Sequence, residues 1–440
     1  MLSVALIQVG GASSYSPAAS GQTPEAKSVH LTPEQLFAIA ESQASIGHTD
    51  DAIELLKVLA KNPNIEFRAE ARVRIARLLQ ARGEFDGALR WYDELLNEKP
   101  NAAAVRIERA QLLVAMVKEQ AAARELRRAD AAGLPPDVAR TVRNAANVFS
   151  AQADFAGDMQ IGIAPSTNIN NATSDDTITI SGLPFQLNSD ARRKSGVGLT
   201  FSGDAVIRRR LTGSSRMTLQ LTTTGKLYRD TTFNDISLSA AAGPDINVGA
   251  IRLQPLMFAG RRFFGRDRLY DFYGGSASGQ LPMGGRAILI LAGSLTQFAY
   301  VGRYSGQTGP AYSLSVAYER AISPRLAMRI ATGISRTRAN DESLSSKGPS
   351  VDLVLSRDVG RMTIIGRGAY RQSRAEYPYS FVGVKRQDRI LDGEISLLLR
   401  QWQILGLSPQ ISSGYTRSSS NIALFDYRRL RGDFSLTKRF

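Results

Sequence analysis

The sequence lacks cysteine and is poor in histidine, and each shortage excludes a kind of chemistry. With no cysteine in 440 residues, the chain forms no disulfide and offers no thiolate nucleophile or cysteine metal ligand. Its only histidines, His30 and His48, are too few for the zinc sites and Ser-His-Asp triads of hydrolases. Carboxylate pairs could serve a glycosidase, but no acidic pair stands out from the background. We therefore expect neither an enzyme nor a cofactor.

Long apolar runs are also missing. After the first dozen residues no stretch approaches the ~18–20 apolar residues that a membrane-spanning helix needs. A strand of a transmembrane barrel needs only ~9–11 residues of alternating character, so the membrane is not excluded. Residues 2–12 are apolar and are followed by small residues at 18–20, although no basic residues precede them. Residues 1–30 thus resemble a secretory signal, with a disordered tail as the alternative.

Positive charge is concentrated in one part of the chain. From residue 157 onward there are 37 Lys and Arg against 21 Asp and Glu, so this part holds the whole net excess of +15. A basic domain is often a nucleic-acid-binding domain. Here the basic residues do not cluster with aromatic residues but are spread over many strand-like segments. We therefore expect no nucleic-acid partner.

Residues 31–150 carry a helical repeat. Thr32, Pro33 and Glu34 form a helix-start signal, with a capping hydroxyl, a proline in the first turn and an acid beside it. Two units with a period of ~34–37 residues follow, and a degenerate third unit extends from residue 103 to residue 136. The second unit is the clearest, with small, turn and bulky residues at Ala76, Gly83, Ala88, Tyr92 and Pro100. This spacing resembles the tetratricopeptide repeat, whose stacked helix pairs form a peptide-binding surface.

After Gly157 the helical period gives way to alternation with a period of two. Apolar residues occupy one strand face and polar residues the other in about fourteen segments separated by turn residues. Among the apolar sets are Val197, Leu199 and Phe201; Tyr312, Leu314, Val316 and Tyr318; and Leu430, Phe434, Leu436 and Phe440. A soluble sandwich also alternates, so the pattern alone leaves both folds open.

Segment length, segment number and the last residue favour a barrel in lipid. Phe440 ends an alternating strand, which resembles the signal that the outer-membrane barrel assembly machinery reads. Closing the strands into a barrel leaves no unpaired edge, as lipid requires. We therefore predict an α + β two-domain chain, with an N-terminal α-helical repeat domain at 31–150 and a transmembrane antiparallel β-barrel of about 14 strands at 157–440.

The barrel prediction places a set of arginines in the lumen, because an arginine facing lipid at mid-bilayer costs ~2–4 kcal/mol. The arginines on the polar face are Arg208, Arg210, Arg329, Arg367, Arg371, Arg431 and Arg439. Two interpretations stay open. These arginines pair with lumen acids such as Asp204, Glu394 and Asp433, or they form a surface that favours anions.

Two segments carry a family resemblance. The first begins at Gly162, includes Pro165 and continues through Asn168, Asn170 and Asn171. The second contains Trp402, Gly406 and Pro409, and then Asn421 and Tyr427. Both resemble the surface lipoprotein assembly modulator (Slam) family, whose members join a signal peptide, tetratricopeptide repeats and a barrel of about fourteen strands.

The resemblance implies an outer-membrane translocator whose repeats lie in the periplasm. Members of the family move lipoproteins or soluble effectors to the cell surface, alongside the barrel assembly machinery and periplasmic chaperones. The expected partners are thus a protein cargo, those two systems and outer-membrane lipid. Three alternatives remain open, namely an exporter of anionic polysaccharide, a passive porin-like channel and a scaffold anchored by its barrel.

Overall fold

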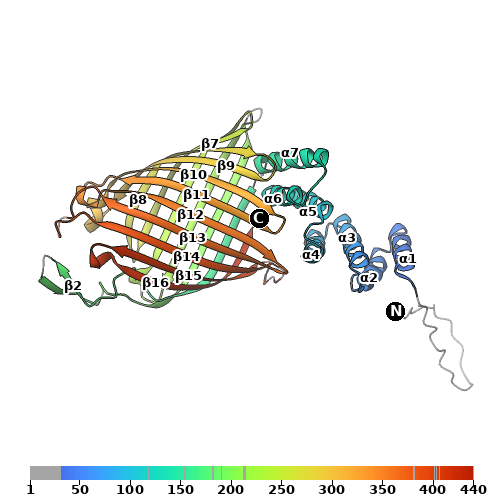
Figure 1. Ribbon diagram of the computed structural model, residues 1–440, viewed down its shortest axis with the longest axis horizontal. Coiled ribbons are helices and arrows are strands. Elements are labelled where there is room, and N and C mark those ends of the chain that lie inside the picture. The colour runs from blue at the N-terminus through green and yellow to red at the C-terminus, as the bar shows by residue number, and fades with distance from the viewer. Residues whose placement is uncertain are drawn as a thin grey trace, which may run out of the picture. The chain divides into compact units, whose positions relative to one another are not determined.

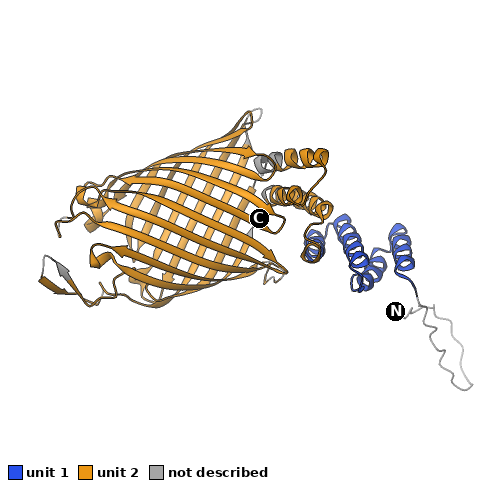
Figure 2. Cartoon of the chain, viewed as in Figure 1, with its two compact units in different colours: residues 1–95 blue, residues 96–440 orange. Residues whose placement is uncertain are grey.

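A computed structural model describes residues 31–116, 118–152, 155–180, 183–189, 191–211, 215–379, 382–400, 402, 404–405 and 407–439 (Figure 1). The signal-like residues 1–30, Gly406 and Phe440 lie outside the described residues, as do the side chains of Arg210 and Arg439. The chain forms two compact units, residues 1–95 and residues 96–440 (Figure 2).

The first unit consists of helices that follow the predicted repeat. They are α1 (Pro33–Ser45), α2 (Thr49–Leu59), α3 (Ile65–Ala81) and α4 (Phe85–Glu98), the last of which runs through the boundary at residue 95. The side chain of Thr32 accepts from the Gln35 amide while Gln35 accepts from the Thr32 amide, a reciprocal cap that begins α1. Gly47 and Gly83 adopt positive φ in the two turns, as the repeat predicts.

The remaining helices belong to the same compact unit as the strands. They are α5 (Ala103–Ala115), α6 (Glu119–Ala131) and α7 (Pro136–Gln152). Their shared core is made of small and aliphatic side chains that are at most 4% exposed, including Leu112, Leu113, Ala122 and Leu126. No helix in the described ranges is both long and apolar enough to cross a membrane. The change from helix to strand falls between Gln152 and Phe155, although the two compact units divide earlier, within α4.

The described strands of the second unit form a closed antiparallel barrel of 14 strands, which confirms the predicted fold. They are β1 (Phe155–Ser166), β4 (Gly196–Arg210), β5 (Arg216–Tyr228), β6 (Asp235–Val248), β7 (Ile251–Phe264), β8 (Asp267–Met283), β9 (Ala287–Tyr300), β10 (Gly309–Ser323), β11 (Leu326–Thr337), β12 (Ser346–Val359), β13 (Met362–Ala375), β14 (Gln387–Leu399), β15 (Ser408–Ser420) and β16 (Tyr427–Arg439). Each pairs with the next along the chain, and β1 closes the barrel by pairing with both β4 and β16. A separate hairpin, β2 (Thr177–Ile180) and β3 (Leu183–Gln186), follows β1.

The two faces of the barrel wall differ as the alternation predicts. Large apolar side chains on the outer face are well exposed, among them Leu199, Leu314, Ile334, Ile395 and Phe434 at 42–62%. Arg329 and Arg367, with the carboxylates Glu319 and Glu394, take the alternate positions and face the interior, whereas the pair Arg261 and Asp271 shares the parity of the outward residues Met257 and Tyr273. This division is the one that lipid outside and a polar lumen inside require.

The two ends of the barrel also differ. Short turns such as residues 249–250, 324–325 and 360–361 lie at the end where α7 leads into β1, which we call the helix end. Longer connections lie at the opposite end, the loop end (Figure 1). Four of these contain 3-10 helices, η1 (Thr231–Phe233), η2 (Gly302–Gln307), η3 (Glu342–Leu344) and η4 (Ala423–Phe425).

Candidate functional site: the lumen and the helices at its mouth

The lumen arginines lie beside carboxylates wherever the structure describes their side chains. Arg208 Nε is 3.7 Å from Asp245, Arg329 Nε 3.0 Å from Glu319, Arg367 Nη1 3.9 Å from Glu394, Arg371 Nη2 3.7 Å from Asp352, and Arg431 Nη1 2.8 Å from Asp392. Of the acids named from the sequence, Glu394 serves as a partner. Asp204 instead accepts from Thr222, and Asp433 accepts from Gln160 and Thr200.

These ion pairs fall into two kinds. Arg431 reaches two carboxylates, Asp392 at 2.8 Å and Glu394 at 3.1 Å, and its side chain is 23% exposed. Arg367 and Arg371 are 58% and 63% exposed, and their partners are 3.9 Å and 3.7 Å away. The first kind joins β16 to β14 across β15, whereas the second leaves a guanidinium available to a molecule in the lumen.

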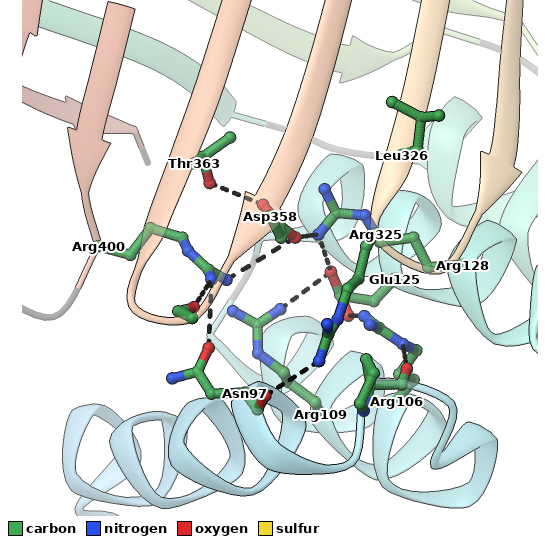
Figure 3. Close-up of polar contacts among 12 residues, drawn as sticks. Asn97, Arg106, Arg109, Glu125, Arg128, Arg325, Leu326, Asp358, Thr363 and Arg400 are labelled. Carbon is green, nitrogen blue, oxygen red and sulfur yellow. Dashed lines mark hydrogen bonds and ion pairs between the residues drawn. The ribbon is translucent and has the colours of Figure 1, made fainter.

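Asn97 and helix α6, both in the second unit, bind the helix end of the barrel through polar side chains (Figure 3). Asn97, in the last turn of α4, accepts from two barrel arginines. Arg325 of the β10–β11 turn donates to its backbone oxygen at 3.1 Å, and Arg400, after β14, donates to its side-chain oxygen at 3.2 Å. One residue of the helical segment thus joins two separate turns of the barrel.

Arg128 of α6 makes the most central contact of this junction. Its Nη1 lies 2.9 Å from Asp358 of β12 and 3.1 Å from Glu125 of its own helix. Asp358 also accepts from Thr363 at 2.7 Å and lies 3.8 Å from Arg400. Figure 3 shows these side chains converging between the helices and the strands. The carboxylate at the end of an inward face therefore anchors α6 at the mouth.

A second link joins α6 to the lumen itself. Arg127 interacts electrostatically with Glu319 of β10, which opposes the lowering of the Arg127 pKa by burial. Glu319 is also the ion-pair partner of the lumen residue Arg329. A line of alternating charges thus leads from the helices into the barrel.

Helix α7 lies beside the helix end of the barrel (Figure 1). Arg143, near its middle, lies against the β8–β9 turn so closely that a Cβ on Gly285 would be 2.1 Å from Arg143 Cδ. From there the helix continues to Gln152, about 14 Å at 1.5 Å per residue, and the chain enters β1 at Phe155. Strands β4–β7 separate β1 from β8 around the barrel. Arg143 and the start of β1 thus meet the rim of the barrel at different strands.

Glu125 holds the helical side of the junction together. Its carboxylate lies 2.9 Å from Arg106, 3.2 Å from Arg109 and 3.1 Å from Arg128, and its side chain is only 5% exposed. Burial raises the pKa of this carboxyl, but the three arginines outweigh that effect and lower the pKa from 4.5 to about 2. Ionised Glu125 is thus the common counter-ion of three guanidinium groups.

Helices α5 and α6 should therefore lose stability in acid. The depressed pKa of Glu125 contributes about 3 kcal/mol to the free energy of unfolding. This contribution is complete above pH 4.5 and is lost as the pH falls towards about 2. We expect Glu125→Gln, which leaves the buried arginines uncompensated, to cost about 3–5 kcal/mol at pH 7. Helical circular dichroism of the detergent-solubilised chain measures both effects, with heat-modifiability as the barrel control. An equal acid-induced loss of helix in Glu125→Gln would show that other carboxylates are responsible.

The two segments of family resemblance meet at the loop end. Asn168 is fully buried, and its Nδ2 donates to Ala172 O at 2.8 Å and to Arg428 O at 3.1 Å. Asn171, whose φ is +52°, accepts from Arg429 at 2.8 Å. These side chains join the start of the barrel to its end, 258–260 residues apart in the chain. The sequence held a signal for this contact, because the first and last strands of a closed barrel must pair.

The other motif residues are spread over both ends of the barrel. Asn170 binds the backbone of Arg192 and Lys194, and Asn421 binds that of Gln387 and Lys385, all at the loop end. Tyr427 begins β16, and Pro165 lies near the end of β1. Trp402, at the helix end, is 66% exposed, and Pro409 of β15 pairs with Leu436. Their functional role stays a prediction.

The junction between the helices and the barrel was not found from the sequence. Asn97, Glu125 and Arg128 look like ordinary charged or polar residues on repeat helices, and Asp358 like one lumen acid among several. The barrel partners of Asn97 and Arg128 lie more than 200 residues away in the chain, so only the assembled barrel brings them together. No cluster of three or more potential metal-ligating side chains occurs among the described residues.

Comparisons with known proteins add the following. Residues 156–440 match the model of a family described as Surface lipoprotein assembly modifier, and residues 45–112 match a Tetratricopeptide repeat model. Among solved structures, a Pseudomonas aeruginosa FadL homologue is 11% identical, with 67% of this chain and 91% of that chain covered and a TM-score of 0.37. The outer membrane channel DcaP of Acinetobacter baumannii is 7% identical, with 65% and 96% covered and a TM-score of 0.38. PcrH from Pseudomonas aeruginosa is 19% identical, with 30% and 96% covered and a TM-score of 0.24. No curated protein matches.

Proposed function

Because this chain belongs to the surface lipoprotein assembly modifier family, we propose that it delivers specific lipoproteins or secreted proteins to the cell surface. The barrel lies in the outer membrane, and the tetratricopeptide repeats lie in the periplasm. Family and fold are those of a membrane translocator or channel barrel. We assign it no catalytic step and no cofactor.

The observation that carries this proposal is the attachment of Asn97 and of helices α6 and α7 to the helix end of the barrel. Asn97 and the α6 residue Arg128 bind turns and strand ends of the barrel, and Arg143 of α7 lies against the β8–β9 turn. These helices lie beside the entrance that a molecule from the periplasm would use. Repeat helices bind extended or helical peptide on their concave face, so their place at the entrance suits the capture of a polypeptide.

Passage would then depend on reversible contacts and needs no bond to form or break. The alternating charges from Arg127 through Glu319 to Arg329 offer polar partners to an extended chain that leaves the helices. Arg367 and Arg371 are exposed in the lumen and lie 3.9 Å and 3.7 Å from their carboxylate partners. Each can leave that partner and bind a carboxylate of the cargo instead. The barrel assembly machinery, periplasmic chaperones and outer-membrane lipid are the further partners that we propose.

The test is the surface level of a tagged lipoprotein or secreted protein encoded by a neighbouring gene. We expect cells that lack this chain to hold the reporter in the periplasm, and cells that regain it to display the reporter at least tenfold more. Loss of an acidic surface polysaccharide, with the reporter still displayed, would indicate the polysaccharide exporter instead. Loss of small-solute uptake alone would indicate a porin.

Topology gives an independent prediction. An epitope inserted within residues 341–347, in the connection that contains η3, should bind antibody on intact cells, because the long loops of such barrels face outward. An epitope near Glu66 in α3 should bind only after the outer membrane is opened. Flow cytometry on intact and permeabilised cells compares the two insertions at matched expression. Antibody access to the α3 epitope on intact cells would contradict the orientation.

A further inference from the structure

The seam between β1 and β16 is the shortest in the barrel. Within the described residues its register joins six consecutive pairs, from Asp158–Arg439 to Ile163–Phe434, and then one more, Ser166–Arg431. Each other pair of neighbouring strands joins eleven to fourteen residue pairs. Opening a seam in lipid leaves its backbone groups unpaired, so the seam with the fewest pairs opens at the lowest cost.

The ladder of this seam is interrupted at Ala164 and Pro165, opposite Asp433 and Gly432. Proline has no N–H to donate. The ring of Pro165 lies against Gly432, where an added Cβ would be 3.3 Å from Pro165 Cγ. Prolines also interrupt the β6–β7 and β12–β13 ladders, at Pro244 and Pro349, but those seams still join eleven and twelve pairs.

Side chains hold the seam where the ladder does not. On the lumen side, Asp433 accepts from Gln160 of β1 at 3.4 Å and from Thr200 of β4 at 2.9 Å. At the loop end, the Thr167 amide donates to Leu430 O, and Asn168 and Asn171 bind Arg428 and Arg429. Such contacts can break and re-form without displacing a strand from its other neighbour. The residues that resemble the family motif thus stabilise, at the loop end, the seam with the fewest residue pairs.

A lipoprotein cargo makes such a seam useful. Its polypeptide is polar and suits the lumen, but every methylene of its acyl chains resists transfer from lipid to water. A closed barrel wall separates the polypeptide of the cargo in the lumen from its acyl chains in the bilayer. The linker between them can follow the polypeptide only through a gap in the wall, while the acyl chains stay in the bilayer.

The outer wall beside this seam is hollowed. A groove of about 990 Å³ is lined by Met159 of β1 and by residues of β4–β8, among them Gly203 and Ala240, and also by the ion pair of Arg261 and Asp271. An acyl chain that moves along the wall from β1 meets this groove first on that side.

We propose that the β1–β16 seam opens sideways to let the linker of a lipid-anchored cargo pass while its acyl chains remain in the membrane. This inference rests on the proposed function. It assigns Pro165 to keeping the ladder open and Asn168 and Asn171 to re-closing it at the loop end. It also separates lipidated from unlipidated cargo, because only the former needs the gap.

The absence of cysteine from the chain makes the test direct. Ile161 and Leu436 pair across the seam, and Ile330 and Leu353 pair across β11–β12 with the same kinds of side chain on the same outer face. Opposed residues in antiparallel strands lie within disulfide range. The seam variant carries Ile161→Cys and Leu436→Cys, and the control carries Ile330→Cys and Leu353→Cys. The probes are the tagged neighbouring lipoprotein and the same protein with its acylated residue replaced by serine.

We expect the oxidised seam variant to display the lipidated probe at least tenfold less, with recovery on reduction. The unlipidated probe should pass at its usual level, and the oxidised control variant should display both. Normal display of the lipidated probe with a closed seam would overturn the proposal. Equal loss of both probes would also overturn it, since the seam would then serve something other than the acyl chains. If the unmodified chain displays neither probe, the proposed function fails and the seam proposal with it.

Discussion

Removing residues 31–84 should leave a folded barrel in the outer membrane while the surface level of the cargo falls at least tenfold. This deletion takes away α1–α3 and keeps α4, whose Asn97 binds Arg325 and Arg400. Helices α5–α7 and their junction with the barrel are untouched. The cargo should accumulate in the periplasm, because much of the surface that collects it is lost while the channel remains.

A longer deletion distinguishes the capture of cargo by the repeats from the closure of the barrel mouth by α5–α7. Removing residues 31–150 also takes away Glu125 and Arg128, and it leaves Asp358 without its helical ion-pair partner. Most of α7, whose Arg143 lies against the β8–β9 turn, is lost too. We expect this variant to strand cargo like the shorter deletion and, in addition, to admit large antibiotics that intact cells exclude. From the sequence alone we would expect the longer deletion only to strand cargo and to leave the barrel inserted, since the repeats have no evident need of the barrel.

The measurements are surface cargo, periplasmic cargo and heat-modifiable barrel in the same cells, together with antibiotic sensitivity. Full display of cargo by the 31–84 deletion would contradict the role of the repeats in capture. Equal antibiotic exclusion by the two deletions would contradict closure of the mouth by α5–α7. Neither result would affect the fold, which rests on the strand register.

The fold could be predicted because lipid imposes a simple pattern on each strand. Leu314 must face outward and Glu319 inward whatever the neighbouring strands are, so alternation along one segment is enough to assign its two faces. The repeats were predictable for a similar reason, since Ala76 and Gly83 occupy positions that any such helix pair must fill with small or turn residues. Both signals are local in the chain.

The contacts of the candidate site could not be predicted in the same way. Arg431 was correctly placed on the polar face, but its partners Asp392 and Glu394 lie on β14, with β15 between them. Choosing these acids over Asp433 requires the register of three strands. The pairing of Asp358 with Arg128 further requires the position of α6 at the mouth. Register and docking depend on many weak contacts at once, and no short segment of sequence records them.

The two kinds of lumen arginine should respond oppositely to substitution. Arg329, Arg367 and Arg371 are 46%, 58% and 63% exposed, and pairs of this kind contribute about 0–1 kcal/mol each. Their joint replacement by glutamine should therefore leave barrel stability nearly unchanged. If they contact acidic segments of the cargo, export should fall several-fold and become more sensitive to salt, because charge-assisted contacts in a wet lumen are screened.

Arg431→Gln is the matched control for the triple variant. It should lower the stability of the barrel and leave export unchanged. Arg431 lies 2.8 Å from both Asp392 and the Thr416 hydroxyl and 3.1 Å from Glu394, so its loss leaves two carboxylates of the wall without their cation. We expect a loss of about 2–4 kcal/mol in the free energy of unfolding, seen as a lower temperature of heat modification. Export per folded barrel should remain close to that of the unmodified chain. A triple variant that is unstable but exports normally per folded barrel would show that the exposed arginines also serve the wall alone, as the paired interpretation of the sequence allows.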